Sequence, residues 1–171
     1  MSIVLIGYRG SGKTTVGRLL SARLDCGFVD TDEQIIRRAG KSIKAIFADH
    51  GEITFRDFET EVVREVAALA NHVIALGGGA LGRTENLAAI SAQKHHLIHL
   101  SCEPHELLRR IESDPATVEA RPALTRLGGG IEEIQRILGE REPIWRKAMS
   151  AEVDVTRLSP PAVVEAIMKL I

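Results

Sequence analysis

Two patterns of apolar residues alternate along the 171-residue chain. Short, mainly apolar runs, typical of strands buried in a parallel sheet, occupy residues 3–6, 28–29, 72–76, 97–100 and 153–155. Between these runs, apolar residues recur every three or four positions, which predicts helices at 13–25, 33–39, 43–49, 55–69, 85–92, 104–110, 131–149 and 160–168. Leu19 is expected on the buried face of the first helix, and Gly27 is expected to cap that helix. The alternation of strands and helices predicts one α/β domain over residues 1–171.

The most informative polar segment lies between the first strand and the first helix. Residues 7–14 read Gly-Tyr-Arg-Gly-Ser-Gly-Lys-Thr, which is the P-loop spacing G-x-x-x-x-G-K-T. The glycines let backbone N–H groups surround a phosphate chain, and the helix N-terminus adds further donors. Lys13 can reach the β- and γ-phosphates, and the Thr14 hydroxyl can bind Mg²⁺. A chance glycine-rich turn is a weak alternative, because strand, spacing and helix are all in place.

Two carboxylates follow the second predicted strand. Asp30 and Asp32 lie where an open parallel sheet binds ligands, beyond the carboxyl ends of its strands. One could serve Mg²⁺ through water, and the other could accept a proton from a substrate hydroxyl or orient it. The alternative is that one of them only caps the next helix.

A basic residue and a glycine triplet mark a further candidate site. Arg56 lies off the apolar face of its helix, and Glu59, three residues later, could hold its guanidinium. Gly77, Gly78 and Gly79 end the third strand, where they would let a ligand approach the main chain. The alternatives are a solvated surface arginine and a plain flexible loop.

Residues 112–125 lack periodicity and are rich in charge and helix breakers. A long segment of this kind in a small domain is often a lid over an active site. Arg121 would then be a candidate to reach the transferring phosphate, with Gly128, Gly129 and Gly130 as a return hinge. The alternative is a surface loop with an idle arginine.

Composition narrows the classes of function. Net charge is −1, which gives no support for a nucleic-acid partner or an anionic membrane surface. No apolar run is long enough to span a membrane, the first residues do not form a signal peptide, and Cys26 and Cys102 form no C-x-x-C motif. A cytoplasmic protein is therefore expected. The six histidines show no metal-binding spacing.

Five landmarks in order resemble the shikimate kinase family over essentially the whole chain. They are the P-loop, the acidic pair at Asp30 and Asp32, the segment from Gly51 to Glu59 with Phe55 and Arg56, the triplet Gly77 to Gly79, and Arg121-Pro122 followed by Arg141-Glu142-Pro143. The resemblance implies a three-layer α/β/α P-loop kinase fold with a five-stranded parallel sheet and a mobile lid. It also implies phosphorylation of the 3-hydroxyl of shikimate by MgATP. A monomer is expected.

Residue roles follow from the same resemblance. Asp32 would hold the reacting hydroxyl and act as base, Lys13 and Arg121 would stabilise charge on the phosphates, and Thr14 and Asp30 would serve Mg²⁺. The resemblance implies substrate contacts from Asp32, Phe47, Phe55, Arg56, Gly77, Gly78, Gly79 and Arg141. It implies ATP contacts from Gly10, Ser11, Gly12, Lys13, Thr14, Thr15, Arg110, Arg121 and Pro160.

Three rival functions are less well supported by the residues. A gluconate-type kinase would share the P-loop and lid but need other acceptor groups than Arg56, Arg141 and the glycine triplet. A GTP-binding switch should carry the motifs N-K-x-D and D-x-x-G, and the sequence has neither. A degenerate kinase kept as a binding module is not indicated, because Lys13, Asp32 and Arg121 are all present.

Overall fold

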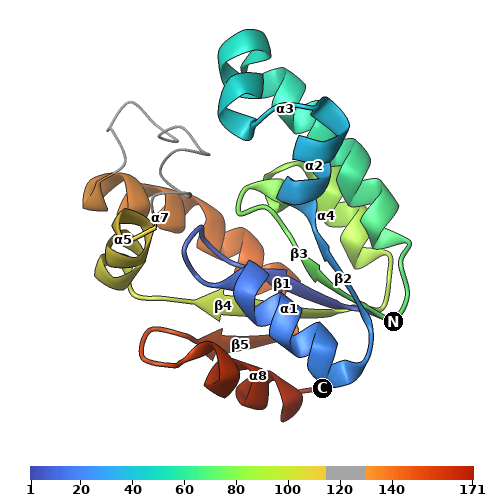
Figure 1. Cartoon of the computed structure of the whole chain (residues 1–171), viewed down its shortest axis with the longest axis vertical. Coiled ribbons are helices and arrows are strands. Elements are labelled where there is room, and N and C mark those ends of the chain that lie inside the picture. The colour runs from blue at the N-terminus through green and yellow to red at the C-terminus, as the bar shows by residue number, and fades with distance from the viewer. Residues whose placement is uncertain (115–129) are drawn as a thin grey trace.

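The fold is a single five-stranded parallel sheet with helices on both faces (Figure 1). A computed structural model describes residues 1–114 and 130–171. The sheet order is β2-β3-β1-β4-β5, and every neighbouring pair is parallel. The strands are β1 (Ile3–Ile6), β2 (Gly27–Asp30), β3 (His72–Ala75), β4 (His96–Ser101) and β5 (Ala151–Asp154). The five-stranded α/β sheet predicted for the chain is therefore confirmed.

Helices connect the strands and form the two outer layers. Those in the first half of the chain are α1 (Lys13–Leu24), α2 (Thr31–Ala39) and α3 (Ile43–Ala67). They are followed by the short 3₁₀ helix η1 (Ala80–Gly82), α4 (Thr84–Ser91), α5 (Pro104–Glu112), α7 (Ile131–Ala148) and α8 (Pro160–Met168). The parallel strands require such crossovers, because a tight turn cannot join them.

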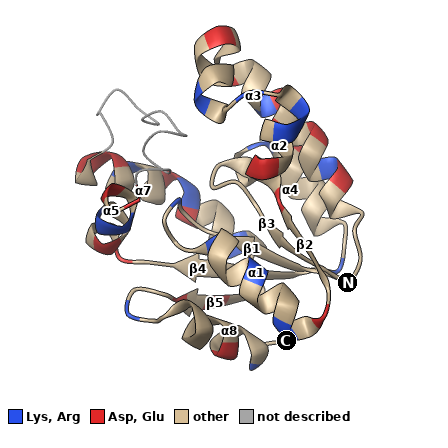
Figure 2. Cartoon of the chain, in the orientation of Figure 1, with Lys and Arg blue, Asp and Glu red and all other residues tan. Residues whose placement is uncertain are grey.

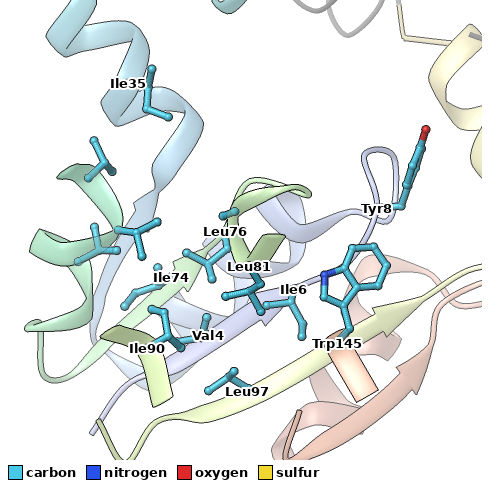
Figure 3. Packing of buried hydrophobic residues seen from close by; sticks show 14 of the residues in the cluster. Val4, Ile6, Tyr8, Ile35, Ile74, Leu76, Leu81, Ile90, Leu97 and Trp145 are labelled. Atoms are coloured by element: carbon cyan, nitrogen blue, oxygen red, sulfur yellow. The ribbon is translucent and has the colours of Figure 1, made fainter. Parts of the chain in front are cut away.

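The sheet buries both faces, as the continuous apolar runs predict. Along β1, Ile3 and Leu5 enter the cluster beneath α1 and α8, whereas Val4 and Ile6 enter the larger cluster beneath α2, α3, α4, α5 and α7. Figure 3 shows the larger cluster, with Trp145 beside the sheet residues. This alternation follows from the period of two along a strand, and it produces three layers.

Charged residues of both signs lie interspersed over the helices, whereas the strands carry few of them (Figure 2). None of the helices within residues 1–114 and 130–171 is long and apolar enough to cross a membrane.

The structure corrects two expectations around the first helix. Asp25, not Gly27, takes the left-handed cap position, with φ of 51°. Gly27 instead begins β2, where a Cβ atom would lie 2.3 Å from the ring of His72. Leu19 is 42% exposed, because α1 turns the small residue Gly17 toward the ring of Phe28.

Helix boundaries differ at two other places. The helices predicted at 43–49 and 55–69 form one element, α3, which is interrupted by Gly51 with φ of 79° and ψ of 175°. Helix α2 begins at Thr31, two residues earlier than expected, because Asp30 is its N-cap.

Candidate active site

The phosphate-binding loop lies at the carboxyl end of the central strand β1. Gly10 and Gly12 have φ of 82° and 89°, values that residues with a Cβ atom rarely adopt. Lys13 is the first residue of α1, and its ammonium group donates hydrogen bonds of 2.8 Å to the carbonyl oxygens of Gly7 and Tyr8. Lys13 thus connects the end of the loop to its first two residues, and it places a cation beside the free N–H groups of a helix N-terminus.

A large cleft of about 870 Å³ extends from this loop. Arg110 of α5 and Pro160 of α8 line the cleft together with the loop. Helix α5 follows β4 and helix α8 follows β5, the two strands that come after β1 in the sheet order. All described residues that the sequence assigns to ATP line this cleft: Gly10, Ser11, Gly12, Lys13, Thr14, Thr15, Arg110 and Pro160. Arg121 and most of the predicted lid lie outside the described residues, so their roles stay predictions.

Asp30 connects the end of β2 to two helices. Its Oδ1 accepts hydrogen bonds from the backbone N–H groups of Asp32 and Glu33 at 2.9 and 3.3 Å, which caps α2. Its Oδ2 accepts a hydrogen bond of 2.6 Å from the Thr14 hydroxyl. Capping was the alternative to a ligand role for the acidic pair, and the geometry of Asp30 allows both at once.

A second, smaller pocket of about 50 Å³ lies beside the cleft. Every residue that the sequence assigns to the substrate lines it: Asp32, Phe47, Phe55, Arg56, Gly77, Gly78, Gly79 and Arg141. They come from α2, α3, the loop after β3 and α7. The sheet order explains the gathering, because β2 and β3 are neighbours and their carboxyl ends bring Asp32 close to the glycine triplet.

Asp32 belongs to the walls of both cavities. It is 8% exposed, and a Cβ atom on Gly77 would lie 2.8 Å from its Oδ1. Gly77 therefore provides the space in which this carboxylate lies. A group bound in the small pocket and a phosphate bound in the cleft could both reach Asp32.

Arg56 is held from its own helix. Its Nη1 donates to Glu59 Oε2 at 2.8 Å, as the sequence predicts, and its Nη2 lies 3.2 Å from Glu52 Oε1. Burial raises the pKa of Glu59, and the nearby charge of Arg56 opposes this shift. The two carboxylates fix the position of the guanidinium at the edge of the pocket.

Arg141 converges on the same point from α7. A Cβ atom on Gly79 would lie 2.7 Å from Arg56 Nη1 and 3.2 Å from Arg141 Nη2. Burial, and then the charge of Arg56, lower the pKa of Arg141. Within residues 1–114 and 130–171, Arg141 forms no ion pair with a carboxylate. Two guanidiniums over a glycine are suited to bind an anion, and a carboxylate could accept hydrogen bonds from both.

Phe47 and Phe55 supply the apolar side of the pocket. Their ring centroids are 4.8 Å apart with an interplanar angle of 37°. The pocket thus has two arginines at one end and an apolar wall of two phenylalanines. The carboxylate of Asp32 lies where the pocket meets the cleft. This combination suits a small carboxylic acid that carries a hydroxyl group.

Two residues of the site were missed by sequence reasoning. Thr31 is fully buried, and its hydroxyl accepts from Gly77 N–H at 2.8 Å and donates to Ala75 O at 3.3 Å, which ties the acidic pair to the glycine loop. Arg9 lines both cavities and pairs with fully buried Glu133 at 3.2 Å. The position of Arg9 inside the P-loop was a usable signal, whereas nothing in the spacing points to Glu133.

Metal-binding side chains are sparse in this region. Across the described ranges, no group of three or more His, Cys, Asp or Glu side chains could hold a metal ion. The Thr14 hydroxyl and Asp30 Oδ2 lie 2.6 Å from each other. Both are oxygen ligands of the kind that Mg²⁺ prefers when phosphate and water complete its coordination shell.

The comparisons with known proteins agree with this arrangement. The family model described as shikimate kinase matches residues 9–171. The shikimate kinase of Rhodopirellula baltica is 36% identical, with 98% of this chain and 88% of the relative covered, and that of Thermobifida fusca is 40% identical, with 97% and 92% covered. A solved shikimate kinase from Acinetobacter baumannii in complex with shikimate has a TM-score of 0.90 at 30% identity, with 99% and 91% covered. Because the family model covers the residues that line both cavities and these relatives cover nearly the whole chain, the chain belongs to the shikimate kinase family.

Proposed function

We propose that the protein transfers the γ-phosphoryl group of ATP to the 3-hydroxyl of shikimate and releases ADP and 3-phosphoshikimate. The observation that supports this most directly is the position of Asp32 in the wall shared by the phosphate cleft and the two-arginine pocket. A donor in the cleft and an acceptor in the pocket would meet at this carboxylate. Transfer then needs positioning and charge neutralisation more than covalent chemistry.

The acceptor end follows from the pocket. Arg56 and Arg141 bind the shikimate carboxylate, Phe47 and Phe55 contact its ring, and the backbone N–H groups of Gly78 and Gly79 add donors. This pose directs the reacting hydroxyl to Asp32, which accepts its proton as the O–P bond forms. The bond between the γ-phosphorus and the β,γ-bridging oxygen breaks, and the electron pair leaves with ADP.

The donor end follows from the loop. Lys13 and the N-terminus of α1 neutralise the phosphate chain, and Arg110 and Pro160 contact the base. Thr14 and Asp30 would hold Mg²⁺, Asp30 through water, and the ion would supply positive charge that neutralises the phosphates. We assign Arg121 to the phosphates on the resemblance alone.

Two broader assignments belong to the same proposal. We propose that the chain acts as a monomer. Light scattering at assay concentration tests this, with a monomer as the expected result. We also place the enzyme in the cytoplasm, where ATP and Mg²⁺ are supplied.

ADP release from MgATP by the purified protein tests the reaction. Shikimate should stimulate release strongly, whereas gluconate and nucleoside monophosphates should not. Stimulation by gluconate alone would keep the roles of the P-loop and overturn the assignments of Arg56, Arg141 and the glycine triplet. Phosphorus NMR of the product should show a phosphate monoester on the 3-oxygen.

A further inference from the structure

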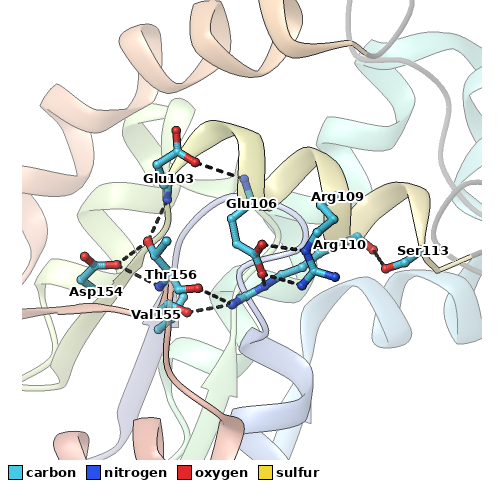
Figure 4. A network of polar contacts seen from close by, with 8 residues as sticks. All are labelled: Glu103, Glu106, Arg109, Arg110, Ser113, Asp154, Val155 and Thr156. Atoms are coloured by element: carbon cyan, nitrogen blue, oxygen red, sulfur yellow. Dashed lines mark hydrogen bonds and ion pairs between the residues drawn. The ribbon is translucent and has the colours of Figure 1, made fainter.

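Arg110 lies in the part of the cleft that we assign to the nucleotide base. Its guanidinium is held by hydrogen bonds that all lie in the plane of the group. Its Nε donates to Glu106 Oε1 at 2.7 Å, and its Nη2 donates to the carbonyl oxygens of Val155 and Thr156 at 2.7 and 3.3 Å (Figure 4). All N–H bonds of a guanidinium lie in its plane. These contacts therefore leave the faces of the group available for stacking on an aromatic base.

Glu106 is the side chain that holds this arrangement from α5. Its Oε1 also accepts from Arg109 Nη2 at 2.7 Å, and its Oε2 accepts from Arg109 Nε at 2.7 Å. Hydrogen bonds from Arg109 and Arg110 lower the pKa of Glu106 to about 2. The carboxylate is therefore ionised at any pH at which a kinase works, and its charged hydrogen bond with Arg110 persists over that range.

The carbonyl oxygens that receive Arg110 are themselves held in place. Asp154 Oδ1 accepts from the backbone N–H and the hydroxyl of Thr156 at 2.9 and 2.6 Å. The Thr156 hydroxyl accepts from Glu103 N–H at 3.0 Å, just before α5 begins. The end of β5 is thus joined to the start of the helix that carries both Glu106 and Arg110 (Figure 4).

We propose that Glu106 is a positioning residue for nucleotide binding, which locks Arg110 against the carbonyl oxygens of Val155 and Thr156 as a ready-made platform for the base. The inference rests on the proposed function, in which Arg110 contacts the base. Glu106 acts through Arg110 and not on the phosphates. Its loss removes the hydrogen bond that holds Nε, so that the long Arg110 side chain is less ordered and nucleotide binding must order it again.

Binding of ADP and of tripolyphosphate to Glu106→Gln and Glu106→Ala separates this role from a general distortion. Tripolyphosphate fills the P-loop but has no base. The dissociation constant for ADP should rise about three- to tenfold, the loss expected when a stacking contact is weakened. That for tripolyphosphate should stay within about twofold. In turnover, the KM for ATP should rise while kcat and the KM for shikimate stay unchanged.

Glu65→Gln is the matched control, because Glu65 accepts a 2.6 Å hydrogen bond from exposed Arg38 outside both cavities. Equal weakening of ADP and tripolyphosphate binding, or no change in either, would overturn the inference.

Arg110→Ala distinguishes failure of the inference from failure of the proposed base contact. If Arg110→Ala weakens ADP binding and the Glu106 variants do not, the base contact stands and the positioning role is wrong. If Arg110→Ala leaves ADP binding unchanged, the base contact itself is wrong and the inference falls with it. The double variant should bind ADP no more weakly than Arg110→Ala, and additive losses would contradict action through Arg110.

Discussion

The hydroxyl of Thr14 donates to Asp30 Oδ2 over 2.6 Å, which joins the first turn of α1 to the end of β2. The other oxygen of the same carboxylate caps α2, the helix that carries Asp32. One side chain therefore fixes the distance between the phosphate loop and the proposed base. It thereby positions the two proposed Mg²⁺ ligands, Thr14 and Asp30 itself, together with the proposed base Asp32.

Thr14→Val removes the hydroxyl and keeps the size of the side chain. We expect the Mg²⁺ concentration for half-maximal rate to rise about tenfold, because one oxygen ligand is lost. Titration of Mg²⁺ at saturating ATP and shikimate measures this. Thr14→Ser keeps the hydroxyl and should behave nearly as the unaltered protein; an unchanged Mg²⁺ requirement in Thr14→Val would contradict the ligand role.

Asp32→Asn keeps the shape of the side chain and removes its ability to accept a proton. We expect kcat to fall by about 10²- to 10³-fold, in line with loss of a general base. Steady-state kinetics and ADP titration measure the two effects separately. The dissociation constant for ADP should change little, and a loss of nucleotide affinity at unchanged kcat would argue against the base role.

Arg141→Lys keeps the charge and loses the planar pair of donors. The KM for shikimate should rise by about tenfold or more, because an ammonium cannot share a carboxylate with Arg56 in the same geometry. The KM for ATP should not change. Arg146→Lys, further along α7 and 64% exposed, is the control; equal effects of both substitutions would exclude a specific clamp.

Gly79→Ala tests the space in front of the two guanidiniums. The new methyl group would lie 2.7 Å from Arg56 Nη1, so the guanidinium would have to shift slightly from the position in which Glu59 and Glu52 hold it, while the backbone around it stays in place. Shikimate affinity should therefore fall by about tenfold while the melting temperature shifts by only about 2 °C.

Gly82→Ala is the matched control, since a Cβ atom there meets nothing within 4 Å. Shikimate titration and thermal unfolding of both variants provide the comparison. Unchanged shikimate affinity in Gly79→Ala would place the carboxylate elsewhere.

His99 should make stability depend on pH. It is 3% exposed beside Trp145, with ring centroids 5.0 Å apart, and burial lowers its pKa below 6.5. Between 6.5 and this lowered pKa, the unfolded chain binds more protons than the native one. Stability should therefore be fully present above about pH 6.5 and decline as the pH falls through the native pKa.

Urea unfolding followed by the fluorescence of Trp145, the only tryptophan, measures this between pH 7.5 and pH 5. His99→Gln should flatten the decline, whereas His105→Gln, at an exposed position, should not. If stability declined as steeply in His99→Gln as in the unaltered protein, groups other than His99 would cause the pH dependence.

Much of the chemistry could be predicted from local patterns. The P-loop, the acidic pair and the glycine triplet each lie directly after a strand, and in a parallel sheet strand ends share one edge. Arg141 differs, because its position 85 residues after Arg56 carries no local signal, and only the resemblance suggested it. Thr31 and Glu133 act through contacts with residues 44 to 124 positions away, which periodicity does not encode.

The sequence by itself determined the strands, most helices, the nucleotide loop and the family, because hydrophobic period and motif spacing are local properties. Tertiary structure decided which residues meet. The order β2-β3-β1-β4-β5 brings the acidic pair beside the glycine triplet, and packing of α7 brings Arg141 to Arg56 over Gly79. Packing also decided that Asp25 rather than Gly27 turns the chain, and that Asp30 serves both a helix cap and Thr14. These outcomes depend on contacts between distant segments, whose energies exceed the weak local preferences that a sequence displays.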